Sequence, residues 1–273
     1  MGIHLAPRGW RTLAASVVGT SHAAAGLPCA DACAARVLRR RRGGRLLVAV
    51  AADGAGTSER APEGARLACQ AVLHRATRWA DGKGELSALG REAFVPWLDE
   101  VQVRIAAAAR AEGRESRDFS CTLLAALVDR GRATFFQVGD GAIVYRRGDG
   151  AYAPALWPQT GEYANCTWFA TDGDAADRMQ AATAQGVHEV ALLTDGLQGL
   201  ALRFATREAH GPFFEPMFSR LRHEREGQPR ALLEELRAFL ASSPVNRRTD
   251  DDKTLVLATR LRPAAAPGPD GEG

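Results

Sequence analysis

Aspartates that adjoin strongly apolar segments are the residues of this chain best suited to do chemistry. Asp53, Asp140 and Asp195 each end such a segment, and the aspartate run 250–252 directly precedes another. A carboxylate at the end of a buried strand is held at the sheet edge, where several can converge. Converging carboxylates need a cation, because burying unpaired charge is costly, and all-oxygen ligand sets suit hard ions such as Mg²⁺ or Mn²⁺. The pattern indicates a carboxylate metal site, with separate turn residues as the alternative.

Glycine follows Asp53, Asp140 and Asp195, and Asp-Gly is also a common turn sequence. The same pair occurs at residues 81–82, 149–150, 172–173 and 270–271, where the surroundings indicate a turn and nothing more. A position directly after an apolar strand distinguishes the first three pairs. The spacing alone leaves both interpretations open.

Motifs of other enzyme classes are incomplete in this sequence. The segment Asp53–Glu59 lies between an expected strand and an expected helix, as a dinucleotide-binding loop would, but Glu59 replaces the last glycine of G-x-G-x-x-G. There is no G-x-x-x-x-G-K-[ST] phosphate loop and no G-x-S-x-G nucleophile motif. Cys29 and Cys33 have no second pair at zinc-binding spacing, which favours two small strand residues.

Charge and composition are those of an ordinary globular protein. The 35 Lys and Arg residues exceed the 32 Asp and Glu residues by three, too small a balance to imply nucleic acid or an anionic membrane as partner. Five scattered cysteines suit a reducing compartment. The longest apolar run, Leu46 to Ala52, is far shorter than the roughly 20 residues that span a bilayer. No targeting segment is recognised, so we expect a cytoplasmic protein.

The elements that must position these residues follow from hydrophobic periodicity. Strands are expected over Thr12–Val18, Ala32–Leu38, Leu46–Ala52, Cys121–Val128, Ala133–Val138, Ala142–Tyr145, Val190–Thr194 and Thr254–Thr259. Helices are expected over Pro62–Ala80, Arg91–Ala111, Leu197–Ala209, Pro212–Glu226 and Arg230–Ala241. Residues 147–187 are predicted to form a long irregular excursion. This order predicts one α+β domain over residues 1–262, followed by a disordered tail over 263–273.

The arginine-rich segment Arg39–Arg45 has two interpretations. Its charge is suited to an anion-binding patch, whereas its glycine pair, Gly43-Gly44, is typical of a solvated hairpin tip. No aromatic residue is interleaved with the arginines, which favours the hairpin.

Six short motifs together resemble the metal-dependent serine/threonine protein phosphatase family, the type 2C class, and especially its compact bacterial branch. They occur in the family's order across residues 12–260: Ser16–His22 with Gly26–Asp31, Ala52–Gly56, Ser120–Thr122, Val138–Gly141, Leu193–Leu197 and Asp251–Thr254. Each motif alone is weak, but their order is specific. The resemblance implies a four-layer αββα sandwich, in which two antiparallel sheets are flanked by helices and metals lie in a cleft at one end.

The resemblance also implies catalytic and metal-binding roles. Asp53 would bridge two Mn²⁺ or Mg²⁺ ions, Gly54 would add its carbonyl oxygen to one, and Asp195 and Asp251 would hold the second. The register of Asp251–Thr254 against the family pattern assigns this role to Asp251, leaving Asp250 solvated and Asp252 free to tie down the loop.

Further roles concern residues around these ions. Asp31 would support metal-bound water, and Asp140 would hold a weaker third ion together with Asp195. The strand-end pattern by itself does not single out Asp31. His22 is the only cationic candidate for binding substrate phosphate near the N-terminus, with a structural hydrogen bond as the alternative.

This chain departs from the family pattern at three places. Ala30 replaces the acidic residue that many members have before the Asp31 position, and no arginine lies between Thr12 and Asp31 to bind phosphate. Ala55 stands where some members have a general-acid histidine. Gly141-Ala142 replaces the Ser-Arg that usually follows the Asp140 position, which would loosen the third-metal side.

The implied reaction is hydrolysis of phosphoserine or phosphothreonine by a water that two metal ions activate, with no protein nucleophile. Its partners would be a phosphorylated protein and, through it, a serine/threonine protein kinase, and we expect a monomer. One alternative is a catalytically silent phosphatase-like adaptor that binds a kinase or phosphoprotein. Another is a hydrolase of small phosphoesters, which the sequence does not separate from a protein phosphatase.

Overall fold

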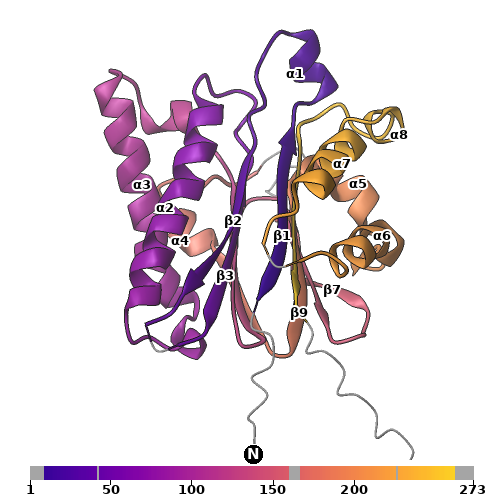
Figure 1. The fold of residues 1–273 in the computed structure, drawn as a ribbon. Helices are drawn as coiled ribbons and strands as arrows, with labels where there is room; N and C mark the ends of the chain where they lie inside the picture. The colour runs from indigo at the N-terminus through magenta and orange to yellow at the C-terminus, as the bar shows by residue number, and fades with distance from the viewer. Residues whose placement is uncertain (1–8, 42, 160–166, 226, 262–273) are drawn as a thin grey trace, which may run out of the picture.

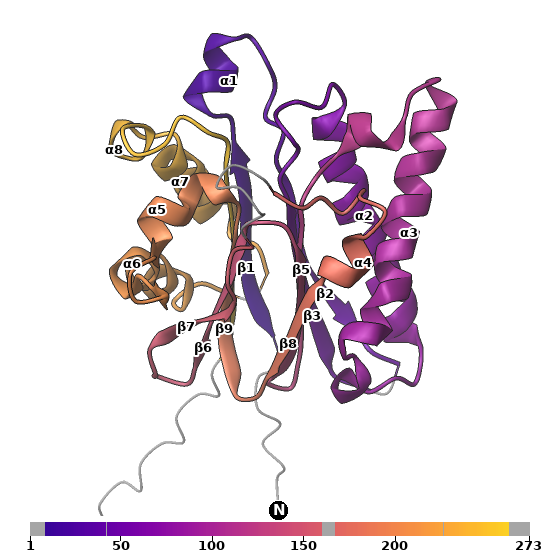
Figure 2. The same ribbon diagram turned by 180° about the vertical axis from the view of Figure 1, so that it is seen from behind.

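The computed structural model describes residues 9–41, 43–159, 167–225 and 227–261. Two five-stranded antiparallel sheets pack face to face, and helices cover both outer faces (Figures 1 and 2). The first sheet has the order β1 (Trp10–Val17), β12 (Lys253–Arg260), β9 (Val187–Leu193), β6 (Ala142–Arg147), β7 (Tyr152–Leu156). The second has the order β2 (Ala32–Arg39), β3 (Arg45–Ala52), β4 (Leu123–Asp129), β5 (Arg132–Val138), β8 (Gln180–Ala184). The predicted αββα sandwich is confirmed.

The helices divide between the two outer faces. Figure 1 shows α2 (Ala61–Asp81), α3 (Arg91–Ala111) and α4 (Ala175–Arg178) on the side of the second sheet. The first sheet carries α5 (Gln198–Ala201), α6 (Gly211–Leu221), α7 (Arg230–Leu240) and α8 (Ser243–Asn246). The short helix α1 (Thr20–Ala24) covers neither face and stands at one end of the sandwich.

Strand β3 explains why the segment Leu46–Ala52 is apolar without alternation. Its even-numbered residues, such as Val48 and Val50, pack against α2 and α3, and its odd-numbered residues, such as Leu47, face the first sheet. A strand covered on both faces needs apolar side chains at every position. The core therefore has three layers, one between the sheets and one under each set of helices.

The predictions for residues 147–187 and Leu197–Ala209 were wrong. The first range contains β7, α4 and β8, and both strands lie at sheet edges. An edge strand tolerates a proline such as Pro154 in β7. Strand β8 forms although its sequence, Gln180–Ala184, has little apolar character. In the second range only α5 is helical, and the chain then forms the hairpin β10 (Leu202–Arg203) and β11 (Glu208–Ala209). Helix α1 was not predicted.

The arginine-rich segment is the tip of the β2–β3 hairpin, as the glycine pair indicated. Arg39 pairs with Arg45, and Gly43 and Gly44 both have positive φ angles that close the turn. Arg40 differs from the solvated hairpin tip that the sequence predicted, because its guanidinium is buried and forms an ion pair with Asp129.

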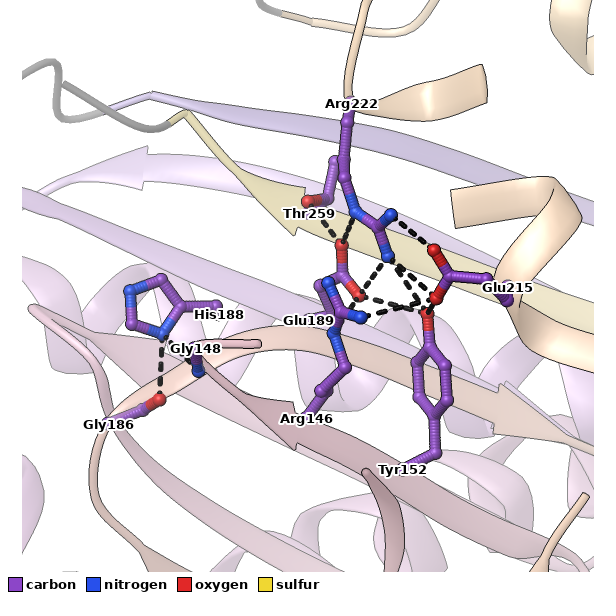
Figure 3. A network of polar contacts seen from close by, with 9 residues as sticks. All are labelled: Arg146, Gly148, Tyr152, Gly186, His188, Glu189, Glu215, Arg222 and Thr259. Atoms are coloured by element: carbon purple, nitrogen blue, oxygen red, sulfur yellow. Dashed lines mark hydrogen bonds and ion pairs between the residues drawn. The ribbon is translucent and has the colours of Figure 1, made fainter. Parts of the chain in front are cut away.

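A buried polar network fixes helix α6 to the first sheet (Figure 3). Glu189 on β9 is 2% exposed and accepts hydrogen bonds from Arg222 at 2.6 and 2.9 Å. The Nε atom of Arg146 on β6 forms an ion pair with Glu189 Oε2 at 2.8 Å. Arg222 also reaches Glu215 on α6 at 2.6 Å, and Tyr152 on β7 joins both glutamates. The two positive and two negative charges therefore neutralise one another.

No helix among the described residues is both long and apolar enough to cross a membrane. The predicted tail over 263–273 lies outside the described residues, and the domain limit at residue 262 stays a prediction.

Candidate metal centre

The strand topology brings the aspartates together at the end of the sandwich where α1 stands. Strands β9 and β12 are antiparallel neighbours, so the end of β9 and the start of β12 share one edge. Strand β3 ends in Asp53 on the facing sheet, and Asp140 lies where the chain crosses from β5 in one sheet to β6 in the other. Asp53, Asp140 and Asp195 each offer a carboxylate oxygen, and these oxygens lie within 4.8 Å of one another.

Asp31 joins this group from the start of β2. It is buried, accepts a hydrogen bond from Thr194 Oγ1 at 2.8 Å, and lies close enough to Asp53 for its charge to raise the pKa of that carboxyl group. The strand-end pattern missed it, because Asp31 precedes an apolar strand rather than following one. In antiparallel sheets the residue before one strand reaches the same edge as the residue after its neighbour, which is a signal that the sequence carries.

The electrostatics of the group are those of crowded carboxylates. Burial raises the pKa of Asp31 to about 7 and that of Asp195 to about 6. The pKa of Asp53 is raised well above its ordinary value by burial and by the charges of Asp31 and Asp195. Burial, with the charge of Asp251, also raises the pKa of Asp140. The neighbouring charges that raise these pKa values are all those of other aspartates.

The residues fit a hard divalent cation. Asp31 Oδ1 and Asp140 Oδ1 are buried, and neither has a hydrogen-bond partner in the described part of the chain. Orphaned buried oxygens are costly, and a bound cation would satisfy them. The converging donors are all carboxylate oxygens, which favour Mg²⁺, Mn²⁺ or Ca²⁺ over soft metals.

The run 250–252 places its three side chains in three different environments. Asp250 is exposed and Asp251 is half-buried. Asp252 is 2% exposed, and its two oxygens accept hydrogen bonds from the backbone N–H groups of Gly19 at 2.6 Å and Ala30 at 2.5 Å. Both oxygens of Asp252 are therefore engaged, which leaves Asp251 as the member of the run available to a metal. Asp251 is not among the three aspartates that approach within 4.8 Å, but its charge raises the pKa of two of them.

His22 has its Nδ1 atom 2.9 Å from Asp252 Oδ2. The imidazole therefore forms a structural hydrogen bond, which was the alternative to phosphate binding for His22. It leaves Nε2 as the only ring nitrogen that could reach a substrate phosphate.

The glycines after the strand-end aspartates are required by crowding rather than by turn geometry. A Cβ atom at Gly54 would lie 2.8 Å from the Ala30 carbonyl oxygen, and one at Gly196 would overlap the Asp252 carbonyl oxygen. By contrast, a Cβ atom at Gly173 would meet nothing within 4 Å, and one at Gly82 or Gly150 would lie no closer than 3.1 Å to a backbone oxygen. Among the described Asp-Gly pairs, contacts shorter than 3.0 Å therefore occur only at the centre.

Neighbouring polar residues hold the aspartates in place. The Asp53 N–H donates to Thr122 Oγ1 at 2.9 Å, and the Thr122 N–H donates back to the Asp53 carbonyl at 2.8 Å. Thr167 Oγ1 donates to Asp140 Oδ2, and Gln198 Nε2 donates to the Asp140 carbonyl at 2.5 Å. Sequence reasoning singled out neither Thr167 nor Gln198, because each is distant in the chain from the residue that it supports.

Known proteins resemble this chain in sequence and in fold. A family model described as Protein phosphatase 2C matches residues 18–241. A protein of Escherichia coli (strain K12) named Serine/threonine-protein phosphatase 3 is 41% identical over 250 residues, which cover 91% of this chain and 98% of that protein.

Solved structures at low sequence identity share the fold. One is described as PppA, a key regulatory component of T6SS in Pseudomonas aeruginosa. Its TM-score is 0.62 at 18% sequence identity, and the match covers 94% of this chain and 100% of the PppA chain. The serine/threonine phosphatase Stp1 from Staphylococcus aureus has a TM-score of 0.60 at 14% sequence identity, and the match covers 95% of this chain and 98% of the Stp1 chain.

Proposed function

Because the chain belongs to the protein phosphatase 2C family and is a metal-dependent protein phosphatase, we propose that it hydrolyses phosphoserine and phosphothreonine in other proteins. The observation that carries the proposal is the convergence of Asp53, Asp140 and Asp195, whose carboxylate oxygens lie within 4.8 Å of one another. At neutral pH, bound cations would offset the repulsion within such a cluster.

We propose that these residues hold two ions, either Mn²⁺ or Mg²⁺, and a weaker third. Asp53 would be a ligand of both ions, and the Gly54 carbonyl oxygen a ligand of one. Asp195 and Asp251 would hold the second ion, and Asp140 with Asp195 a third. When bound, such ions supply Lewis acidity toward the phosphoryl group and the water that attacks it.

The chain's own groups supply positioning. Asp31 is buried in the cluster, and its Oδ1 atom has no hydrogen-bond partner among the described residues, so this oxygen is available to a water. Thr194 fixes the orientation of this carboxyl group through its hydroxyl. We assign Asp31 the role of orienting the attacking water and His22 Nε2 that of a candidate contact for the substrate phosphate.

A silent phosphatase-like adaptor is the less favoured function. An adaptor would have no use for several carboxylates that repel one another in a half-buried cluster, since replacing them would stabilise the fold. We also propose that the physiological substrates are phosphorylated by a serine/threonine protein kinase, and that the enzyme acts as a monomer in the cytoplasm.

Phosphate release from a phosphothreonine peptide and from p-nitrophenyl phosphate tests the proposed function. We expect no turnover after exhaustive EDTA treatment, full recovery with Mn²⁺ and partial recovery with Mg²⁺, because all the proposed ligands are oxygens. Asp53→Asn should abolish turnover and Mn²⁺ binding by calorimetry while the circular dichroism spectrum is kept. Turnover that survives chelation would contradict the mechanism, and a wild type inactive with Mn²⁺ on both substrates would favour the adaptor.

A further inference from the structure

We propose that residues 18–31, which connect β1 to β2 and which we call the N-terminal arm, form a docking surface for the substrate protein. The arm would bind apolar residues that flank the phosphorylated residue. This inference rests on the proposed function, since it assigns the protein-recognition surface of the same site.

The arm is exposed and almost without charge. Helix α1 has no buried residue, and residues 23–28 are all exposed. Leu27 is 53% exposed and Val18 is 36% exposed, two of the five large hydrophobic side chains that the described residues leave exposed. Between Gly19 and Ala30 there is no Asp, Glu, Lys or Arg. An exposed apolar surface beside a reaction centre is typical of a recognition site.

Hydrogen bonds hold the arm rigidly against the start of β12. Asp252 accepts from the N–H groups of Gly19 and Ala30 and contacts His22, so one buried carboxylate fixes both ends and the helix of the arm. Ser21 adds two hydrogen bonds to the Asp250 carbonyl, at 2.9 Å from its N–H and 2.8 Å from its hydroxyl. A surface fixed in advance loses little conformational entropy when a peptide binds.

The arm ends within the metal centre. Its last residue is Asp31, and the Ala30 carbonyl oxygen packs directly over Gly54. Leu27 precedes Asp31 by four residues, so their Cα atoms are at most about 14 Å apart, because an extended chain spans at most about 3.3–3.6 Å per residue. A phosphopeptide bound in an extended form would therefore reach Leu27 with a residue within about four positions of the phosphorylated one.

Charge decides the chemistry of the occupant. An acidic flanking sequence would find no positive charge between Gly19 and Ala30, apart from the imidazole that Asp252 holds, and a basic one would find only the exposed Asp250 beside Ser21. Apolar flanking residues such as leucine or valine would instead bury part of Leu27 and Val18. The arm therefore selects phosphopeptides with an apolar residue close to the phosphorylated residue.

Charge substitutions at Leu27 test this proposal. Leu27→Asp should raise KM for a leucine-flanked phosphothreonine peptide about 10-fold, because contact with one apolar side chain is lost. With p-nitrophenyl phosphate, which is too small to reach the arm, kcat and KM should stay unchanged. Leu27→Lys should weaken the same peptide but improve a peptide with glutamate flanks, and a merely structural role of Leu27 would not produce this exchange.

Val103→Asp is the matched control, since Val103 is also exposed, at 64%, and its helix α3 lies on the outer face of the second sheet (Figure 1). It should change neither substrate's kinetics. Equal KM values for the leucine-flanked peptide in wild type and Leu27→Asp would overturn the docking surface while leaving the phosphatase proposal intact. An equal loss on p-nitrophenyl phosphate, or a change of oligomeric state in Leu27→Asp without a change of peptide KM, would also overturn it. A wild type inactive on both substrates with Mn²⁺ would overturn both proposals.

Discussion

Three adjacent aspartates illustrate how strongly the environment of a single residue determines its chemistry. Asp250 is exposed, Asp251 is half-buried beside the acidic cluster, and Asp252 is buried with backbone donors on both oxygens. In an extended segment neighbouring side chains alternate in direction, so one step of register exchanges the proposed metal ligand for a structural anchor.

Asparagine substitutions at Asp251 and Asp250 separate these roles. We expect Asp251→Asn to reduce kcat at least about 100-fold and to weaken Mn²⁺ binding, because it removes the charge that offsets the cation while keeping the side-chain shape. Asp250→Asn is the control and should be nearly silent, since its side chain is solvated. Phosphatase kinetics and Mn²⁺ calorimetry measure both. If Asp250→Asn inactivates and Asp251→Asn does not, the assigned register is wrong by one residue.

At the scale of elements, helix α6 is attached to the first sheet by charge as well as by apolar packing. Glu189, 2% exposed, lies between Arg146 and Arg222, and Thr259 Oγ1 donates to it at 3.0 Å (Figure 3). The network begins on β9 six residues before Asp195, about 20 Å along the strand at roughly 3.3 Å per residue. Its role is therefore in holding the layers together.

Removing Glu189 should destabilise the fold without changing the chemistry. Glu189→Ala removes the buried carboxylate between Arg146 and Arg222. Breaking a buried ion pair in this way lowers the unfolding free energy by about 3–5 kcal/mol. The matched control is Glu234→Ala, because Glu234 is 68% exposed and its pair with Arg237 contributes at most about 1 kcal/mol. Urea denaturation measures the difference, and kcat per folded molecule should be unchanged. A loss no larger than that of the control would contradict a stabilising role for this network.

At the scale of the whole molecule, the acidic centre joins the two sheets. Asp53 follows β3 of one sheet, Asp195 follows β9 of the other, and Asp140 lies on the crossover between them. Without cations these carboxylates repel one another across the sandwich. Cations would therefore crosslink the two halves of the fold as well as serve the reaction.

The stability of the metal-free protein should fall as pH rises. Burial raises the pKa of Asp31 to about 7 and of Asp195 to about 6, whereas the unfolded chain has the ordinary value near 3.8. Between those values the folded state binds more protons than the unfolded state, so the unfolding free energy decreases from about pH 4 to pH 7 and then levels off.

Mn²⁺ should reverse this trend, because it competes with protons for the same carboxylates. We expect the rise in Tm produced by saturating Mn²⁺ to be several degrees larger at pH 8 than at pH 5.5. Scanning calorimetry at both pH values, with Asp53→Asn as the control that lacks the effect, measures it. A rise in Tm that is equal at both values would show that these aspartates do not bind the ion.

The sequence by itself predicted an α+β domain and most of its elements, and its resemblance to the type 2C family implied the sandwich. Apolar continuity in Leu46–Ala52 and helical spacing in Arg91–Ala111 are local signals, so helix α3 begins and ends where the periodicity predicts. The weak edge strands β7 and β8 were missed because their pairing depends on a partner strand that is distant in sequence. The helix expected over Leu197–Ala209 was wrong for a different reason, since α5 ends at Ala201 and the chain then folds back as the local hairpin of β10 and β11.

The sequence also marked Asp53, Asp140 and Asp195 by their positions at strand ends, but only the tertiary structure decided that they converge. Antiparallel pairing and the crossover between sheets bring residues more than 50 positions apart to one point, and no local pattern encodes that. The pinning of the N-terminal arm by Asp252, the support of Asp140 by Thr167 and the crowding at Gly196 likewise depend on long-range contacts. Side-chain types therefore indicated the chemistry, and the packing of the two sheets decided where it is assembled.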